Sequence, residues 1–366
     1  MQKKIIALAI AAAVSAPALA DNANVTVYGK VFMDVESVKN DKVAAVSKDN
    51  AMRVNSNASR LGVKGSEDLG GGLNAIYQYE VEMGADGVAA AGLGKTRNSG
   101  AGLEGGFGKV ILGNWDSPFK VAHNKIELFD NTTVFSALNL IGRANATTSY
   151  NTRQAQMIQY WSPNFSGLQA AVMYSPATTP STTVDKGILS MAATYDMDAI
   201  YVSGAYESRK DATTAGSTDS GMRLVGRYTL GDAWLGATFE TIKINKSAVL
   251  SYSQKNLELV GQYKFGPSKL ALSYAKAGST DVAKTGATQV SLRYGFDFSK
   301  RTEFFVAYTT LKNDAATATA GSGGAYNFNA DGKAFYGAGT AAAAAATATN
   351  PGAALTALGA GLIHSF

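Results

Sequence analysis

Apolar and polar residues alternate strictly along three segments of the chain, Leu73–Met83, Leu257–Phe265 and Val290–Phe298. In the third segment every second residue is aliphatic or aromatic, and Ser291 and Arg293 stand between them. Successive side chains of a strand point to opposite faces, so a period of two is typical of a strand with one apolar face. Helical spacing fits none of the three segments. The pattern therefore predicts β-strands here.

Further segments follow the same rule less strictly. They are Val25–Glu36, Met52–Ser66, Arg97–Gly105, Phe107–Trp115, Arg153–Ser162, Leu168–Ser175, Gly187–Asp196, Ala199–Ser208, Gly221–Leu230, Ala233–Lys243, Lys269–Ala277, Thr302–Lys312 and Leu355–Phe366. Together with the first three they predict 16 strands. Their lengths match the roughly 9–11 residues that a tilted strand needs to cross the hydrocarbon core of a bilayer.

The connections between these strands alternate in length. Short ones, such as Met197-Asp198 and Gly266-Pro267-Ser268, alternate with longer polar ones, of which Asp116–Thr152 and Asn313–Ala354 are the longest. Tight turns at one end and long loops at the other are typical of a transmembrane barrel. A water-soluble β-sandwich is the alternative, but its strands are usually about 5–6 residues long. The sequence therefore predicts an all-β fold, a 16-stranded antiparallel transmembrane β-barrel with short periplasmic turns and long external loops.

The first 20 residues differ from the rest of the chain. Two lysines precede an apolar run from Ile5 to Val14, and Ala18-Leu19-Ala20 has the small residues of a cleavage site. This pattern is typical of a secretory signal, since a membrane-spanning anchor needs about 20 apolar residues. We expect a signal peptide over residues 1–20 and the barrel over residues 21–366. No later stretch is apolar enough to predict a transmembrane helix.

Composition narrows the classes of function. The chain has no cysteine and only two histidines, His123 and His364. A disulfide, a thiolate nucleophile and a cysteine-based metal site are therefore excluded, and an all-histidine metal site nearly so. Without the two signal-peptide lysines the formal charge is 31 − 28 = +3, which is too small to indicate a nucleic-acid partner. We expect no cofactor, no metal and no nucleic acid.

Four motifs then occur in a recognisable order. The segment Ala58–Leu73 reads ASRLGVKGSEDLGGGL, Arg97-Asn98-Ser99 precedes Gly102–Gly108, Tyr160–Gly167 reads YWSPNFSG, and Gly361–Phe366 ends the chain as GLIHSF. Together they resemble the general porins of β-proteobacteria, over practically the whole chain from Val25. The resemblance implies a homotrimeric outer-membrane porin whose third external loop, residues 116–152, folds back into each pore as a constriction loop.

The resemblance also implies partners. Phe366 stands where the family carries a C-terminal signal for the barrel-insertion machinery. Outer-membrane lipid and lipopolysaccharide would surround the barrel, and ions and small hydrophilic solutes would pass through it.

Strand parity assigns charged residues to the interior of the barrel. If the apolar stripe faces lipid, the opposite parity faces water in the pore. Because Leu61 then faces outward, Arg60 and Lys64 face inward, and Glu80 and Glu104 do so by the same rule. Fixed positive charge in a pore raises the local concentration of anions.

Anion-preferring members of the resembled family carry an arginine cluster at the constriction. The motifs place its counterparts at Arg60, Arg97 and Arg153, with Arg143 as an alternative to the third. Glu104 and Asn114 depart from the residues that many relatives carry, so we expect only weak anion selectivity. The predicted selectivity residues are Arg60, Lys64, Arg97, Arg153, Glu80, Glu104 and Asp116, and Glu127 and Asp130 on the loop could oppose the arginines.

These observations favour a general diffusion pore. Pro118 is expected to turn the chain inward, since proline ends strand pairing; the alternative for this site is that Trp115 simply anchors the barrel at the membrane interface. A substrate-preferring channel is a second possibility, and the low-complexity segment Ala315–Ala354 would suit a surface adhesin. An enzyme is not expected, because the one histidine off the lipid-facing stripe, His123, is interpreted as a solvated loop side chain.

Overall fold

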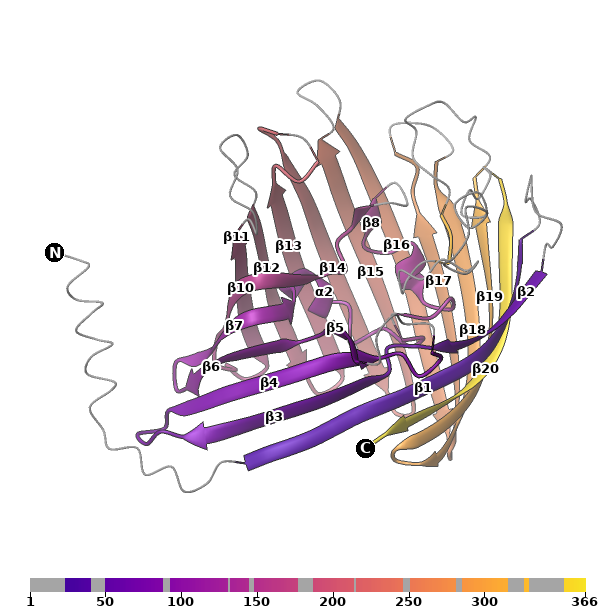
Figure 1. Ribbon diagram of the computed structural model, residues 1–366. Helices are drawn as coiled ribbons and strands as arrows, with labels where there is room; N and C mark the ends of the chain where they lie inside the picture. The colour runs from indigo at the N-terminus through magenta and orange to yellow at the C-terminus, as the bar shows by residue number, and fades with distance from the viewer. Residues whose placement is uncertain are drawn as a thin grey trace.

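The computed structural model describes residues 24–40, 50–87, 93–130, 132–144, 148–176, 187–213, 215–245, 251–280, 285–314, 326–328 and 352–366. The predicted signal peptide lies outside the described residues. Figure 1 shows the strands closed into one tall barrel, with the C-terminus toward its lower rim. Within the described residues, no helix is long and apolar enough to cross a membrane.

The barrel wall is one antiparallel sheet. Its strands are β1 (Asn24–Asn40), β2 (Asn50–Ser56), β3 (Arg60–Asp68), β4 (Asn74–Met83), β5 (Leu93–Thr96), β6 (Ser99–Gly105), β7 (Gly108–Asp116), β10 (Arg153–Trp161), β11 (Leu168–Pro176), β12 (Gly187–Met197), β13 (Ile200–Lys210), β14 (Thr218–Leu230), β15 (Ala233–Asn245), β16 (Ser251–Phe265), β17 (Ser268–Ala277), β18 (Ala287–Ser299), β19 (Thr302–Asn313) and β20 (Ala354–Ser365).

These 18 segments form 16 positions around the barrel. Both β2 and β3 pair with β1, and both β5 and β6 pair with β4, so each of these two pairs is one interrupted strand. The barrel closes where β1 pairs with β20 over eleven residues, from Lys30 opposite Ser365 to Asn40 opposite Leu355. The prediction of a 16-stranded antiparallel barrel is therefore confirmed.

The turns and loops also divide as the sequence predicts. Two-residue connections join β12 to β13 and β14 to β15, and Asp198 and Gly231 in them have positive φ angles of 51° and 57°. Tight hairpin turns favour such left-handed backbone, which glycine adopts without strain. The longest connections, residues 117–152 and 314–353, follow β7 and β19.

Burial alternates along the strands with the predicted parity. In β18, Val290, Leu292 and Tyr294 are exposed on the outer surface, whereas Ser291 and Arg293 are buried inside. A soluble protein hides its apolar face, so this reversed pattern is that of a barrel with lipid outside.

The connection between β7 and β10 folds into the barrel. It carries the short helix α2 (Pro118–Val121), the 3₁₀ turn η1 (Ala137–Asn139) and the two-residue strands β8 (Arg143–Ala144) and β9 (Thr148–Ser149). Ser117 caps α2 by accepting a hydrogen bond from the Lys120 amide, and Pro118 occupies the first turn, where no amide donor is needed. Residues 117–152 are called the constriction loop from here on.

Two apolar clusters pack inside the barrel around this loop. The first joins Phe135 and Leu138 of the loop to small wall residues such as Ala275 and Ala307. The second joins Phe119 and other loop residues to wall residues of β13 to β16. The inner face of the wall therefore does not face water throughout, because alanines on it leave room for the large apolar side chains of the loop.

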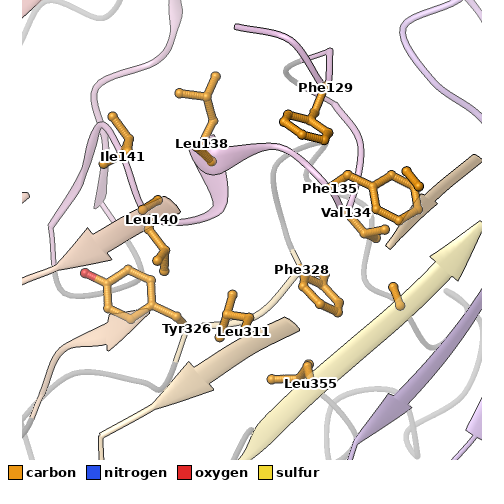
Figure 2. Packing of buried hydrophobic residues seen from close by; sticks show 14 of the residues in the cluster. Phe129, Val134, Phe135, Leu138, Leu140, Ile141, Leu311, Tyr326, Phe328 and Leu355 are labelled. Atoms are coloured by element: carbon orange, nitrogen blue, oxygen red, sulfur yellow. The ribbon is translucent and has the colours of Figure 1, made fainter. Parts of the chain in front are cut away.

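Two residues of the last long connection, Tyr326 and Phe328, also lie in the first cluster. Figure 2 shows Tyr326 and Phe328 packed beside Leu140 and Leu311, and both aromatic side chains are buried. The Tyr326 amide donates to the Asn313 side chain over 2.7 Å. The sequence predicted a long external loop over Asn313–Ala354, and for Tyr326 and Phe328 that prediction is wrong because both side chains are buried inside the barrel. Residues 315–325 and 329–351 lie outside the described residues.

Candidate pore constriction

Wall side chains hold the constriction loop on one side of the barrel. Several of them donate hydrogen bonds to loop backbone carbonyls, which an irregular segment cannot satisfy by itself. Tyr201 donates to Ala122 over 2.7 Å, and Arg223 donates to Phe119 over 3.0 Å. Further donors are Arg227 to Lys125, Asn256 to Arg143, Gln289 to Val134 and Arg293 to Leu128. These wall residues belong to β13, β14, β16 and β18.

Basic residues project into the barrel from a different part of its wall, around β3 and β4. Glu80 on β4 accepts hydrogen bonds from the Arg97 Nε over 2.6 Å and from the Tyr28 hydroxyl over 3.0 Å. The Arg60 Nε lies 3.8 Å from the same carboxylate. The Arg60 side chain is 30% exposed and that of Arg97 only 11%, so Arg60 is the more accessible of the two to a passing ion.

A second carboxylate gathers two more cations. Asp116 ends β7, and its Oδ1 lies 2.9 Å from the Arg153 Nε and 2.6 Å from the Lys120 Nζ. Asn98 bridges Arg153 and Asp116, because its Oδ1 accepts from Arg153 over 2.8 Å while its Nδ2 donates to Asp116 over 3.3 Å. Arg97 is close enough to Asp116 to stabilise its charged form.

A third ion pair ties the loop to β1. Lys30 pairs with Asp130, which lies on the constriction loop. Burial alone would raise the pKa of Asp130, but the charges of Lys30 and Arg60 outweigh it and hold that pKa below its usual range. Burial lowers the pKa of Lys120, and the Asp116 carboxylate opposes this effect.

These residues form one charged group, called the constriction cluster here. It contains the cations Lys30, Arg60, Arg97, Lys120 and Arg153 and the carboxylates Glu80, Asp116 and Asp130. Five positive and three negative charges give 5 − 3 = +2. Such a group raises anion concentration at the narrow part of a water-filled path.

Two of the predicted selectivity residues lie elsewhere. Lys64 is four residues along β3 from Arg60, and its ammonium stands 5.3 Å from the centre of the Tyr28 ring. Glu104 is next to the β6–β7 turn, opposite Lys109. Lys64, Glu104 and Lys109 line a separate cavity of about 390 Å³. The alternation of side chains along each strand correctly predicted that Lys64 and Glu104 point inward. It carries no information on how far along the barrel axis each residue lies.

The positions of Arg153, Arg143 and Trp115 decide between the alternatives that the sequence left open. Arg153 belongs to the cluster, whereas the alternative, Arg143, lies on the loop and donates to the Leu138 carbonyl over 2.9 Å. Trp115 packs with the buried cluster of Met157 and Met173, so it is not a membrane-interface anchor.

Sequence reasoning missed two features of the loop. Lys120 was not assigned to the cluster, although its place four residues after Asp116 allows an ion pair across one helical turn. His123 is 1% exposed and contacts Glu258 on the wall, so its interpretation as a solvated side chain is wrong. Its partner is 135 residues away in the chain, and no local signal indicates it.

Phe366 lies at the seam of the barrel. Its backbone amide donates to the Gly29 carbonyl over 3.1 Å, and the Gly29 amide donates back to the Phe366 carbonyl over the same distance. A Cβ atom at Gly29 would stand 2.3 Å from the Phe366 ring and 2.7 Å from the Arg60 carbonyl, so the ring and backbone fit there only around glycine.

Comparison with known proteins identifies the family. The model of the Gram-negative porin family matches residues 7–316. Outer membrane porin protein 32 of Delftia acidovorans is 30% identical over 325 residues, which cover 87% of this chain and 92% of the relative. An anion-selective porin from Comamonas acidovorans superposes with a TM-score of 0.73 at 24% identity, covering 94% of this chain and 100% of that one.

A more distant solved structure has the same fold. OmpT of Vibrio cholerae, described in a trimer form, superposes with a TM-score of 0.62 at 16% identity, covering 94% of this chain and 100% of that one. The barrel, its inward loop and the family match agree. The chain therefore belongs to the family of Gram-negative porins, channel proteins of the bacterial outer membrane.

Proposed function

We propose that this porin is a general diffusion pore with a weak preference for anions. Ions and small hydrophilic solutes pass passively, and the protein is neither an enzyme nor dependent on a cofactor. The observation that carries the proposal is the constriction cluster, in which five cations outnumber three carboxylates at the inward loop. Most of these cations are paired, which argues for a weak rather than a strong preference.

Similar proteins support two further parts of the proposal. A solved structure of this fold is described as an anion-selective porin, and another as a trimer form. We infer a homotrimer embedded in outer-membrane lipid and lipopolysaccharide, with Phe366 contributing to recognition by the barrel-insertion machinery. Arg60, Arg97 and Arg153 are proposed as the residues that attract anions, with Glu80 and Asp116 limiting the effect.

A catalytic role for His123 has no support from its contacts. Its Nε2 atom faces the carboxylate of Glu258 rather than a serine hydroxyl, so it does not form a nucleophile–base pair there. The contacts instead fix the loop to the wall.

The proposal is tested by reconstituting purified protein in a planar bilayer and measuring the zero-current potential in a salt gradient. We expect stable channels with a potential of the sign that indicates anion preference. Arg60→Ala and Arg97→Ala should each reduce it, because each removes a cation from the cluster. The absence of stable channels, or a cation preference in the unmodified protein, would overturn the proposal.

A further inference from the structure

A buried histidine stands between two buried carboxylates where the constriction loop meets the wall. The His123 Nε2 lies 2.6 Å from the Glu258 carboxylate on β16, and its Nδ1 lies 3.9 Å from the Glu127 carboxylate on the loop. Among the described residues, none forms a hydrogen bond with the Nδ1 atom. The three side chains are between 1% and 8% exposed, so water screens their charges poorly.

Other polar groups around the three do not neutralise their charge. The Phe129 amide and the Ser136 hydroxyl donate to Glu127 over 2.8 and 2.9 Å, and the Ser273 hydroxyl donates to Glu258 over 3.2 Å. All of these donors are neutral groups.

Further charged groups in the described part of the chain face Glu127 across a small cavity. This cavity of about 160 Å³ is lined by Glu127, Leu128, Gln262, Lys269, Arg293 and Glu303. Arg293 pairs with Glu303, and Lys269 pairs with Glu303 and with Asp297, each of the latter over 2.8 Å. The two wall cations are therefore already engaged, and the cavity gives water a place beside Glu127.

The charge of the buried group depends on the proton of Glu127. Loss of that proton adds one negative charge at a site that is buried beside a second carboxylate, that of Glu258. An additional buried charge is costly, so loss of the Glu127 proton weakens the seat of the loop.

The same stretch of loop carries part of the constriction cluster. Lys120 precedes His123 by one helical turn, and Asp130 follows Glu127 by three residues. A loosened contact at His123 therefore allows movement of two cluster residues, one positive and one negative.

We propose that His123 is a positioning residue of the pore, which seats the constriction loop against Glu258 most firmly while Glu127 holds a proton, so that rising pH loosens the loop and widens the path. This inference rests on the proposed channel function. Burial raises the pKa of Glu127 to about 7, with the nearby Glu258 charge also raising it and His123 opposing, which places the change near neutrality.

The test measures single-channel conductance and zero-current potential of the full-length protein between about pH 5.5 and 8.5, which brackets the raised pKa of Glu127. We expect conductance to rise with pH, with a midpoint near 7. The ratio of seated to displaced loop should change by up to about tenfold for each pH unit.

Three variants separate this inference from its alternatives. Glu127→Gln keeps one side-chain oxygen to accept from the Phe129 amide, and its NH2 group can donate to the Ser136 hydroxyl. It cannot lose a proton, so conductance should stay at the low-pH value throughout. His123→Phe should give the high-pH conductance at every pH. The matched control is His364→Gln, which removes the only other histidine and should keep the pH response.

The outcomes also distinguish the two proposals. If no channel forms, the channel function itself fails. If channels form but the unmodified conductance is constant with pH, or if Glu127→Gln responds to pH as the unmodified protein does, the role of His123 is overturned while the channel stands. Should His123→Phe fail to fold, the comparison of Glu127→Gln with the unmodified protein decides alone.

Discussion

Replacing Glu80 by glutamine should strengthen the anion preference of the pore. Glu80 is the shared partner of Arg97 and Arg60, at 2.6 and 3.8 Å. Glutamine has nearly the same shape and can still accept the Tyr28 hydrogen bond. The substitution therefore removes one negative charge and raises the charge of the constriction cluster from +2 to +3, and both arginines remain.

The size of the effect follows from the charge removed. One unit charge about 5 Å from a passing ion in water is worth about 0.8 kcal/mol. Screening at about 0.1 M salt, where the Debye length is about 10 Å, leaves about 0.5 kcal/mol. That changes the local anion concentration about twofold in one direction and the cation concentration about twofold in the other, so the permeability ratio should rise about fourfold.

The assay is the zero-current potential in a salt gradient, and the matched control is Glu104→Gln. Glu104 stands beside Lys109 at the β6–β7 turn, seven residues along the strand from Arg97, which is about 23 Å at 3.3 Å per residue. We expect a much smaller change for the control. The reasoning is refuted if Glu80→Gln leaves the potential unchanged, lowers the anion preference, or shifts it no more than Glu104→Gln does.

Three further predictions concern the stability and assembly of the barrel. Tyr326→Ala or Phe328→Ala should lower the free energy of unfolding by about 3 kcal/mol or more, because each empties a buried site in the first apolar cluster; denaturant titration in detergent would show no change if these rings are not packed there. Burial raises the pKa of Glu127 from 4.5 to about 7, so the folded barrel keeps a proton that the unfolded chain loses. The contribution of Glu127 to stability should therefore be greatest below about pH 4.5 and fall by at most about 3 kcal/mol as pH rises through 7, and Glu127→Gln should abolish that part of the slope in the same titration. Gly29→Ala should reduce the yield of folded barrel on a heat-modifiability gel, since its Cβ meets the Phe366 ring and the Arg60 carbonyl, and an unchanged yield would contradict the tight seam.

The alternation of side chains predicted the barrel well because its physical cause is local. A residue such as Leu292 faces lipid and its neighbour Arg293 faces the interior, so each strand records its own two environments. Neither the fold of the constriction loop nor its contacts with the wall can be predicted from a local pattern of this kind. The constriction loop has no period, and its partners are distant in the chain, as with Lys30 and Asp130, which are 100 residues apart.

The candidate site shows the same division. Parity and motif together correctly predicted that Arg60 and Glu80 would point inward, and the structure brings them together with Arg97 and Arg153. Glu104 points inward too, but its height depends on the register of β6 against β7, which a single strand pattern does not contain. The roles of all these residues in selectivity stay predictions until conductance is measured.

The most direct test of the central claim is the zero-current potential of the unmodified protein in a planar bilayer, measured with salts whose ions differ in size. The +2 charge of the constriction cluster predicts a modest potential of the sign produced by faster anion passage. This potential should decrease as the salt concentration rises, because the Debye length then shortens. A potential of the opposite sign, or one independent of salt concentration, would contradict the account.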